Sequence, residues 1–331
     1  MTARVAALRV WRLGAVTLLL LASAVQAGSG DARDWITRMN GALATRSYDG
    51  VFIHVMSGKR QTLRIIHRME NGKMAERLIF ANGTGREVVR NGSQWVAYFP
   101  DLKIARAETR NRSWGAMVAL NGLSEESKRY YDISTGGTER LLGRMAQLVR
   151  VDPRDGFRYG YRFWLDQQTA MPLKTQRITR AGEVLEEISF LTLEMRTSIP
   201  DELLKPDVDP ESLKWLRPDT HVGDNSLKSG FAPRKEMLPP GFRVAFNNPG
   251  SDPNSKEPRT RFIVSDGVDW VSVFIEPADK GQPPSNARPD GVVLMGLSAT
   301  YVSRQEAYKV TAVGEVPPMT VKSIADAFQP E

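Results

Sequence analysis

The residues that could carry catalysis are few and widely separated. The 331-residue chain has three histidines, His54, His67 and His221, and no cysteine. Without cysteine there is no thiolate nucleophile, no cysteine-ligated zinc and no iron–sulfur cluster. The chain also has no H-E-x-x-H zinc motif and no G-x-S-x-G nucleophile elbow. We therefore expect a protein that is not an enzyme, with no catalytic residues, no metal site and no cofactor.

Two weaker patterns lead to the same expectation. The stretch Asn82-Gly83-Thr84-Gly85 begins like a phosphate-binding loop but lacks the final Lys-Ser/Thr, so a plain turn is favoured. Arg154-Asp155 and Asp266-Gly267 are typical of turns. Acidic residues are numerous, but nothing in the sequence pairs them, and a hydrolase of an unfamiliar kind stays open as the alternative.

Aromatic residues are concentrated in the first half of the chain, where they could bind a ligand. Along 157–165, Phe157, Tyr159, Tyr161, Phe163 and Leu165 alternate with other residues, so they share one face of a predicted strand. Such a face is either ordinary core or a groove for acyl chains, with 114–123 as its lid. The predicted lipid groove comprises Trp95, Tyr98, Phe99, Trp114, Met117, Leu120, Tyr159, Tyr161 and Phe163.

A second candidate surface lies near the C-terminus. Trp270, Ser272 and Phe274 alternate with Val271, Val273 and Ile275. A strand this apolar is typically covered on both faces. Either a helix predicted over 318–328 and the rest of the module cover it, or the face of Trp270, Ser272 and Phe274 contacts a partner protein.

The elements around these residues form a long series of strands. A helix is predicted over 31–45, with Trp35, Met39 and Leu43 on one face, and irregular or helical cover over 111–131. The dipeptides Asn71-Gly72 and Asn91-Gly92 predict hairpins. The expected strands cover 51–56, 62–69, 75–80, 86–90, 94–99, 143–151, 157–165, 173–179 and 183–195. Together they predict an α+β fold with a large curved antiparallel β-sheet, a half-barrel covered by helices.

The amino-acid composition changes after this series of strands. Residues 199–240 are rich in Pro, Asp, Ser and Lys, which is typical of an extended linker. A small C-terminal α+β domain follows. We expect residues 1–27 to be a signal peptide, 28–200 the large domain, 201–235 the linker and 236–331 the small domain.

The first residues predict export. Arg4, Arg9 and Arg12 precede an apolar run over 13–24, and Val25-Gln26-Ala27 suits a signal peptidase. The alternative, a retained membrane anchor, is disfavoured because about 20 apolar residues are needed to cross a bilayer. Once those arginines are removed, the formal charge of +7 falls by three, and the basic residues are scattered. Nucleic-acid binding is therefore not expected, and the expected location is the periplasm.

Several segments, taken in order, resemble the RseB/MucB family of periplasmic sigma-factor regulators. The resemblance covers nearly the whole chain after the leader, and no single segment is specific. The segments are Asp49-Gly50-Val51-Phe52, 85–92, Ala97-Tyr98-Phe99-Pro100, Tyr130-Tyr131-Asp132, 155–159, Trp164-Leu165-Asp166, Met171-Pro172-Leu173, 238–242, 265–267, 271–275 and 313–318.

The resemblance implies a fold and a function. The large domain would resemble the lipoprotein carriers LolA and LolB. The protein would bind the periplasmic domain of a transmembrane anti-sigma factor (RseA/MucA-like) and shield it from regulated proteolysis, and lipid or lipopolysaccharide acyl chains would release it. The alternative is a periplasmic lipoprotein or lipid carrier that uses the first domain alone. A homodimer is neither required nor excluded by the sequence.

Overall fold

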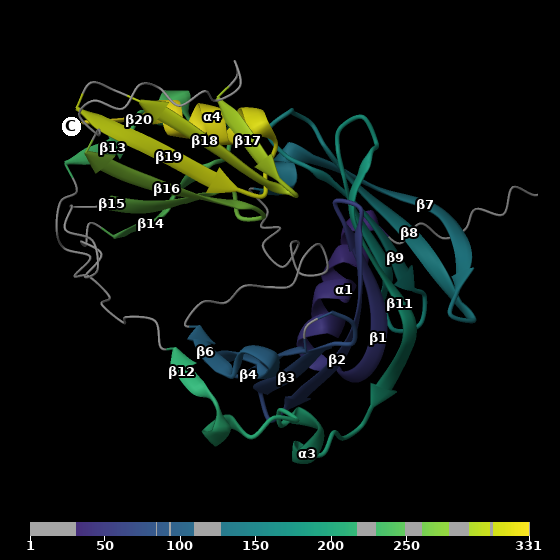
Figure 1. Cartoon of the computed structure of the whole chain (residues 1–331). Helices are drawn as coiled ribbons and strands as arrows, with labels where there is room; N and C mark the ends of the chain where they lie inside the picture. The colour runs from purple at the N-terminus through teal and green to yellow at the C-terminus, as the bar shows by residue number, and fades with distance from the viewer. Residues whose placement is uncertain are drawn as a thin grey trace, which may run out of the picture.

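The described part of the chain contains two large β-sheets that lie side by side, and one two-stranded sheet (Figure 1). The structure is a computed structural model, and it describes residues 31–83, 85–92, 94–108, 127–216, 230–248, 260–277, 291–304 and 307–330. The predicted signal peptide, the predicted lid over 114–123 and His221 lie outside these ranges. Within the described part of the chain, no helix is long and apolar enough to cross a membrane.

The first sheet has twelve strands in the order β12-β6-β5-β4-β3-β2-β1-β11-β10-β9-β8-β7. All neighbours are antiparallel except β12, which runs parallel to β6. The strands are β1 (Ser47–Met56), β2 (Lys59–Glu70), β3 (Lys73–Phe80), β4 (Arg86–Asn91), β5 (Gln94–Phe99), β6 (Ile104–Glu108), β7 (Tyr131–Leu141), β8 (Arg144–Pro153), β9 (Gly160–Asp166), β10 (Pro172–Ile178), β11 (Val184–Arg196) and β12 (Lys214–Leu216).

This sheet bends around helix α1 (Ala32–Thr45) (Figure 1). The carboxylate of Asp31 caps the helix by accepting the N–H of Arg33. Ile36, Met39 and Leu43 are buried in the core on the inner face of the sheet. Trp35, predicted to face the core, is only partly buried, with the Arg38 guanidinium 4.3 Å from its ring centroid. The predicted large curved antiparallel sheet with helical cover is thereby confirmed.

The hairpin turns show which predictions from dipeptides hold. Asn71 and Gly72 both have positive φ, as the predicted turn requires. The second predicted hairpin also forms, between β4 and β5, but Asn91 pairs with Gln94 and ends the strand, so of the predicted pair Gly92 has positive φ and Asn91 does not. The turns at Ser57-Gly58 and Leu142-Gly143 have the same two positive φ values, although neither contains Asn or Asp.

Strand β7, which begins at the last residue of the cover predicted over 111–131, was not predicted from the sequence. A short 3-10 turn, η3 (Ser127–Tyr130), leads directly into strand β7. This strand lies at the edge of the sheet, and most of its side chains are exposed or half-buried. An edge strand of this kind needs no alternating apolar pattern, and residues 131–141 show no sustained alternation.

The first part of the predicted linker is folded onto the outer face of the first sheet. It forms α3 (Asp201–Leu204), η4 (Pro210–Ser212) and β12. Leu204 packs with Ile66, and Leu213 packs with Tyr98. A buried Arg77 also bonds the Asp207 carboxylate at 2.7 Å. Residues 201–216 of the predicted linker are therefore folded against the first domain.

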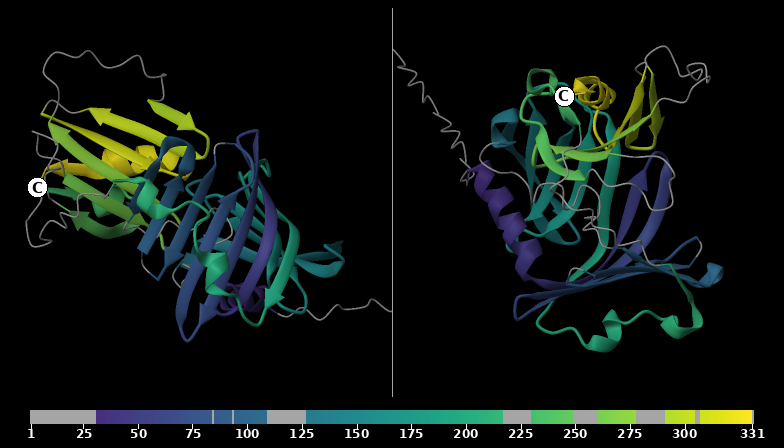
Figure 2. Two further views of the ribbon diagram at one scale, coloured as in Figure 1. Left: turned by 60° about the horizontal axis from the view of Figure 1, so that its bottom comes forward. Right: turned by 90° about the vertical axis from the view of Figure 1, so that its left-hand side faces the viewer.

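The second sheet has six strands in the order β14-β15-β16-β19-β18-β17. The strands are β14 (Arg243–Asn248), β15 (Thr260–Ser265), β16 (Trp270–Pro277), β17 (Val292–Met295), β18 (Ser298–Arg304) and β19 (Tyr308–Gly314). Helix α4 (Pro318–Ala327) covers one face through Val321, Ile324 and Ala325. Beside α4 lie η5 (Lys235–Met237) and a two-stranded sheet of β13 (Phe231–Pro233) and β20 (Phe328–Pro330). In Figure 2, α4 lies on the side of this sheet turned away from β2–β6.

Candidate functional site: two sheet faces and the joint between the domains

The aromatic face of the first sheet is its core. Trp95, Tyr161 and Phe163 are buried together with α1, and the last two are fully buried. Tyr159 is buried as well, and Phe99 is partly buried against the same core. These side chains are therefore buried in the core of the first domain, and their contact with a lipid stays a prediction.

Two parts of the predicted groove do not join this face. Tyr98 points to the outer face of the sheet, where it packs with Ala105 and Leu213. Its neighbours Ala97 and Phe99 contact the inner core, because successive side chains of a strand point to opposite faces. Trp114, Met117 and Leu120 lie outside the described residues.

The second candidate surface is the face of the second sheet away from α4, here called the open face. Val271, Val273 and Ile275 are buried beneath α4, whereas Trp270 is 50% exposed and Ser272 and Phe274 are half-buried. The expectation that this strand is covered on both faces is therefore wrong at Trp270. The guanidinium of Arg261 lies 5.5 Å from the Phe274 ring centroid and donates to the Ser272 hydroxyl at 3.2 Å.

Strand pairing extends the open face across the whole sheet. The partners of Ser272 are Ile263 on β15 and Val313 on β19, and Thr300 and Val293 continue the row across β18 and β17. Phe246 pairs with Ile263 at the other edge. None of these side chains is fully buried. Sequence reasoning missed them because it could not tell that β19 lies between β16 and β18.

The joint between the two domains is a further site that the sequence did not indicate. Arg158, from the turn before β9, is fully buried, and its Nε donates to the carboxylate of Asp266 at 2.7 Å. It also donates to the Asp155 carboxylate and to the carbonyl of Pro240. The rings of Tyr130 and Phe242 lie 4.3 and 5.0 Å from its guanidinium carbon.

Asp155 and Asp266 lie in turns, as predicted, and each also binds Arg158. One oxygen of Asp266 accepts the N–H groups of Val268 and Asp269, each at 2.9 Å, and the other binds Arg158. Asp155 accepts the N–H of Phe157 and also binds Arg158. Each turn therefore presents a carboxylate to one cation shared by both domains.

Further polar contacts surround this ion pair. The hydroxyl of Tyr161 lies 3.3 and 3.4 Å from the carboxylate oxygens of Asp269, which is buried. Arg177 on β10 binds Glu186 on β11 at 3.4 Å and Glu315, after β19, at 3.0 Å. The hydroxyl of Thr320 on α4 donates to the carbonyl of Phe157 at 2.8 Å.

Burial and charge raise the pKa of Asp269 strongly. Loss of hydration is the largest cause, and the neighbouring carboxylates of Asp266 and Glu315 act in the same direction. Arg177 and the hydrogen bond from Tyr161 oppose them, and the resulting pKa is about 7. Burial also raises the pKa of Tyr161 well above its usual value, so this hydroxyl stays protonated near neutral pH.

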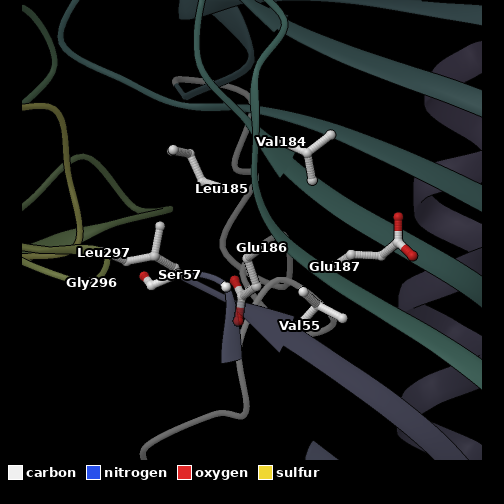
Figure 3. A pocket seen from close by; sticks show the side chains of 9 residues that line it. Val55, Ser57, Val184, Leu185, Glu186, Glu187, Gly296 and Leu297 are labelled. Atoms are coloured by element: carbon white, nitrogen blue, oxygen red, sulfur yellow. The ribbon is translucent and has the colours of Figure 1, made fainter. Parts of the chain in front are cut away.

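Hairpin turns from the two domains line a small cavity beside this joint (Figure 3). It has a volume of about 190 Å³. Its lining comprises Val55, Ser57, Gly58, Val184, Leu185, Glu186, Glu187, Gly296 and Leu297. The carboxylate of Glu186 is already bonded to His54 Nε2 at 2.8 Å, and the rest of the lining is mostly apolar.

The histidines that the structure describes have structural partners. His67 is buried, bonded to Glu76 at 2.9 Å and stacked on Tyr48. His54 is bonded to Glu186. Among the described residues there is also no group of three or more His, Cys, Asp or Glu side chains that could hold a metal ion.

Comparisons with known proteins agree with this two-domain architecture. Residues 31–208 match the model of the MucB/RseB N-terminal domain, and residues 227–329 match that of the C-terminal domain. The sigma factor AlgU regulatory protein MucB of Pseudomonas aeruginosa is 30% identical, over 95% of this chain and 97% of its own. The sigma-E factor regulatory protein RseB of Escherichia coli K12 is 28% identical, over 94% of each chain.

Solved structures give the same result. The complex of Pseudomonas aeruginosa MucA and MucB contains a chain with a TM-score of 0.71 and 26% identity, covering 91% of this chain and 99% of that one. A second structure, of MucB with the periplasmic part of MucA, has a TM-score of 0.69 and 25% identity, with the same coverage. A curved sheet joined to a small sheet-and-helix domain, matched over nearly its whole length by sigma-factor regulatory proteins, places the chain in the class of regulatory binding proteins. The chain belongs to the MucB/RseB family.

Proposed function

We propose that this protein is a periplasmic regulator that binds the periplasmic domain of a transmembrane anti-sigma factor. By occupying that domain it would protect the anti-sigma factor from regulated proteolysis and so restrain an envelope-stress sigma factor. Two full-length relatives are named as regulators of sigma factors, and the MucB chain of similar fold is bound to MucA. The observation in this chain that carries the proposal is the open face of the second sheet.

The chemistry of the open face suits an extended, partly apolar polypeptide. Trp270, the first residue of β16, is half exposed. Phe246 and Val293 are exposed on the two edge strands of the sheet. Aromatic side chains in partly desolvated positions typically supply most of the binding energy of an interface. Arg261, next to Phe274, adds a cation that an acidic segment of the partner can use.

Lipid or lipopolysaccharide acyl chains are the proposed releasing ligand. Of the predicted groove residues, Trp95, Phe99, Tyr161 and Phe163 are already packed in the core cluster that contains α1. An acyl chain would therefore need residues 109–126, which include Trp114, Met117 and Leu120, or a displaced core. The carrier alternative uses this domain alone and gives no role to the second sheet, which favours the regulatory proposal.

The test is partner binding measured by calorimetry, with the periplasmic segment of the anti-sigma factor from the same organism as the probe. Trp270→Ser should weaken binding at least tenfold, because removing a central aromatic anchor typically costs about 2 kcal/mol or more. Phe274→Ser should weaken it in the same direction.

The matched control is Leu191→Ser on the first sheet, since Leu191 is 49% exposed and apolar. This variant should bind the probe as the unaltered protein does. Equal losses for Trp270→Ser and Leu191→Ser would place the contact away from the open face. Absence of binding by the intact protein would overturn the regulatory proposal itself.

A further inference from the structure

The buried joint between the domains contains more negative than positive groups. Two guanidinium groups, Arg158 and Arg177, face a larger set of carboxylates from both domains. Asp266, Asp269 and Glu186 are buried, Asp155 is partly exposed, and Glu315, at the rim of the joint, is more than half exposed. Buried charges without a full complement of opposite charge are costly, and a buried carboxyl group commonly relieves the cost by binding a proton.

Asp269 is the carboxyl group with the least compensation. Asp266 has Arg158 at 2.7 Å and Glu315 has Arg177 at 3.0 Å. The hydrogen bonds in which the side chain of Asp269 takes part come from the Tyr161 hydroxyl at 3.3 and 3.4 Å. Asp269 belongs to the second domain and Tyr161 to the first, so this contact exists only while the joint is closed.

The groups that face Asp269 come from every element around it. Tyr131 on β7 and Tyr159 before β9 join Tyr161, and burial raises the pKa of all three hydroxyl groups, which keeps them neutral. Arg177 on β10 is the opposing cation. Asp266 on its own turn and Glu315 after β19 are like charges. His54 binds Glu186, which is also an ion-pair partner of Arg177.

We infer that the joint between the two domains is controlled by protons, and that it closes more firmly as its surroundings become acidic because Asp269 takes up a proton on closure. This role goes beyond the proposed function, since it concerns how the domains are held together whichever partner is bound.

The direction follows from the two states of the joint. In the closed joint the pKa of Asp269 is about 7, whereas in the open joint the carboxyl group meets water and returns toward its ordinary value. The closed state therefore binds the proton more tightly. The stabilising contribution of this group is complete below the ordinary pKa of 3.8, falls as the pH rises above that value, and is lost above about 7.

The test is the rate at which a buried thiol in the joint reacts with a thiol reagent. The chain has no cysteine, so Thr320→Cys would introduce a single one at a fully buried position that contacts the first domain. When the joint recloses faster than the thiol reacts, the rate reports the fraction of open joints. Met295→Cys places a thiol at a 76% exposed site, so its rate gives the intrinsic pH dependence of the reaction. Dividing the Thr320→Cys rate by the Met295→Cys rate at each pH gives a normalised rate.

We expect the normalised rate of Thr320→Cys to rise about tenfold between pH 6 and pH 8. Adding Asp269→Asn, which has the same shape and no ionisable group, should remove this rise. Ala312→Cys lies in the core of the second domain itself and should react more slowly than Thr320→Cys at every pH.

The midpoint of the pH dependence is the pH, about 7, at which Asp269 is half protonated in the closed joint. Two further changes should move this midpoint in opposite directions. Tyr161→Phe removes a hydrogen bond that lowers the pKa of Asp269, so the midpoint should move to higher pH. Glu315→Gln removes a neighbouring negative charge, so the midpoint should move to lower pH. Glu315 is more than half exposed, so this variant should fold even if Tyr161→Phe does not.

Three results would overturn the inference. The first is a normalised rate that does not change between pH 6 and pH 8. The second is the same rise in the Asp269→Asn background. The third is an equal rate for Thr320→Cys and Ala312→Cys, because the thiol would then be reached by unfolding of the second domain and not by opening of the joint.

Discussion

Arg158 connects the two domains through both electrostatic and aromatic contacts. It forms an ion pair with Asp266, donates to the carbonyl of Pro240 and lies between the rings of Tyr130 and Phe242. A guanidinium suits this position because it is planar, offers several fixed donors and stacks on aromatic rings. A buried pair of this kind stabilises little relative to an apolar contact, but removing one member leaves the other charge unpaired.

This asymmetry gives a prediction at the scale of single residues. Arg158→Met should lower the free energy of unfolding by about 3–5 kcal/mol, because Asp266 then stays buried without its cation. Adding Asp266→Asn should recover part of the loss, since the amide oxygen can still accept the N–H groups of Val268 and Asp269. Urea denaturation of the two variants measures both effects. A double variant less stable than Arg158→Met would show that the unpaired charge is not the cause.

At the scale of elements, packing between β1 and β11 leaves no room for a side chain at Gly50. A Cβ there would lie 2.7 Å from Cε1 of Phe190 and 2.8 Å from the carbonyl oxygen of Thr192. The backbone oxygen cannot move away without disturbing the pairing of Gly50 with Leu193. Glycine is therefore needed at this position for close approach of two strands.

Gly50→Ala should accordingly destabilise the protein by about 1–3 kcal/mol through overpacking. Gly41 is the control, because it is exposed on α1 with nothing within 4 Å of an added Cβ. Gly41→Ala should stabilise by about 0.5–1 kcal/mol, as alanine favours the helix. Thermal unfolding compares the two. A stabilised Gly50→Ala variant would contradict the close packing described for these strands.

Sequence reasoning succeeded where neighbours along the chain decide the structure. The alternation of Tyr159, Tyr161 and Phe163 predicted a shared aromatic face, and Asn71-Gly72 predicted a hairpin. It failed where distant segments meet: Arg158 and Asp266 are 108 residues apart, and no local pattern pairs them. Trp270 and Phe274 were predicted as an interaction surface, but the neighbours that complete this face depend on the order of the strands. The domain boundaries and the residues that contact lipid or partner stay predictions.

At the scale of the whole molecule, the joint should make the two domains unfold together. Opening it exposes Arg158, Asp266 and Asp269, which are fully or almost fully buried when it is closed. We expect one calorimetric transition for the unaltered protein at pH 6. In Arg158→Met the transition should broaden or split, because the second domain can then separate and unfold by itself. A single sharp transition in both proteins would mean that the ion pair does not couple the domains.

The second sheet is attached to the first at two distant places, and this has a topological consequence. One attachment is the joint, formed largely by the β7–β10 end of the first sheet; the other is the backbone that continues from β12, at the opposite end. Because the chain is continuous from Leu216 to Gly230, the first sheet, this connection and the second sheet form a closed circuit when the joint is closed. A polypeptide that crosses this circuit is encircled, so it leaves either by sliding lengthwise or after the joint has opened. The lifetime of such a complex would then depend on the joint as well as on the contacts that hold the polypeptide.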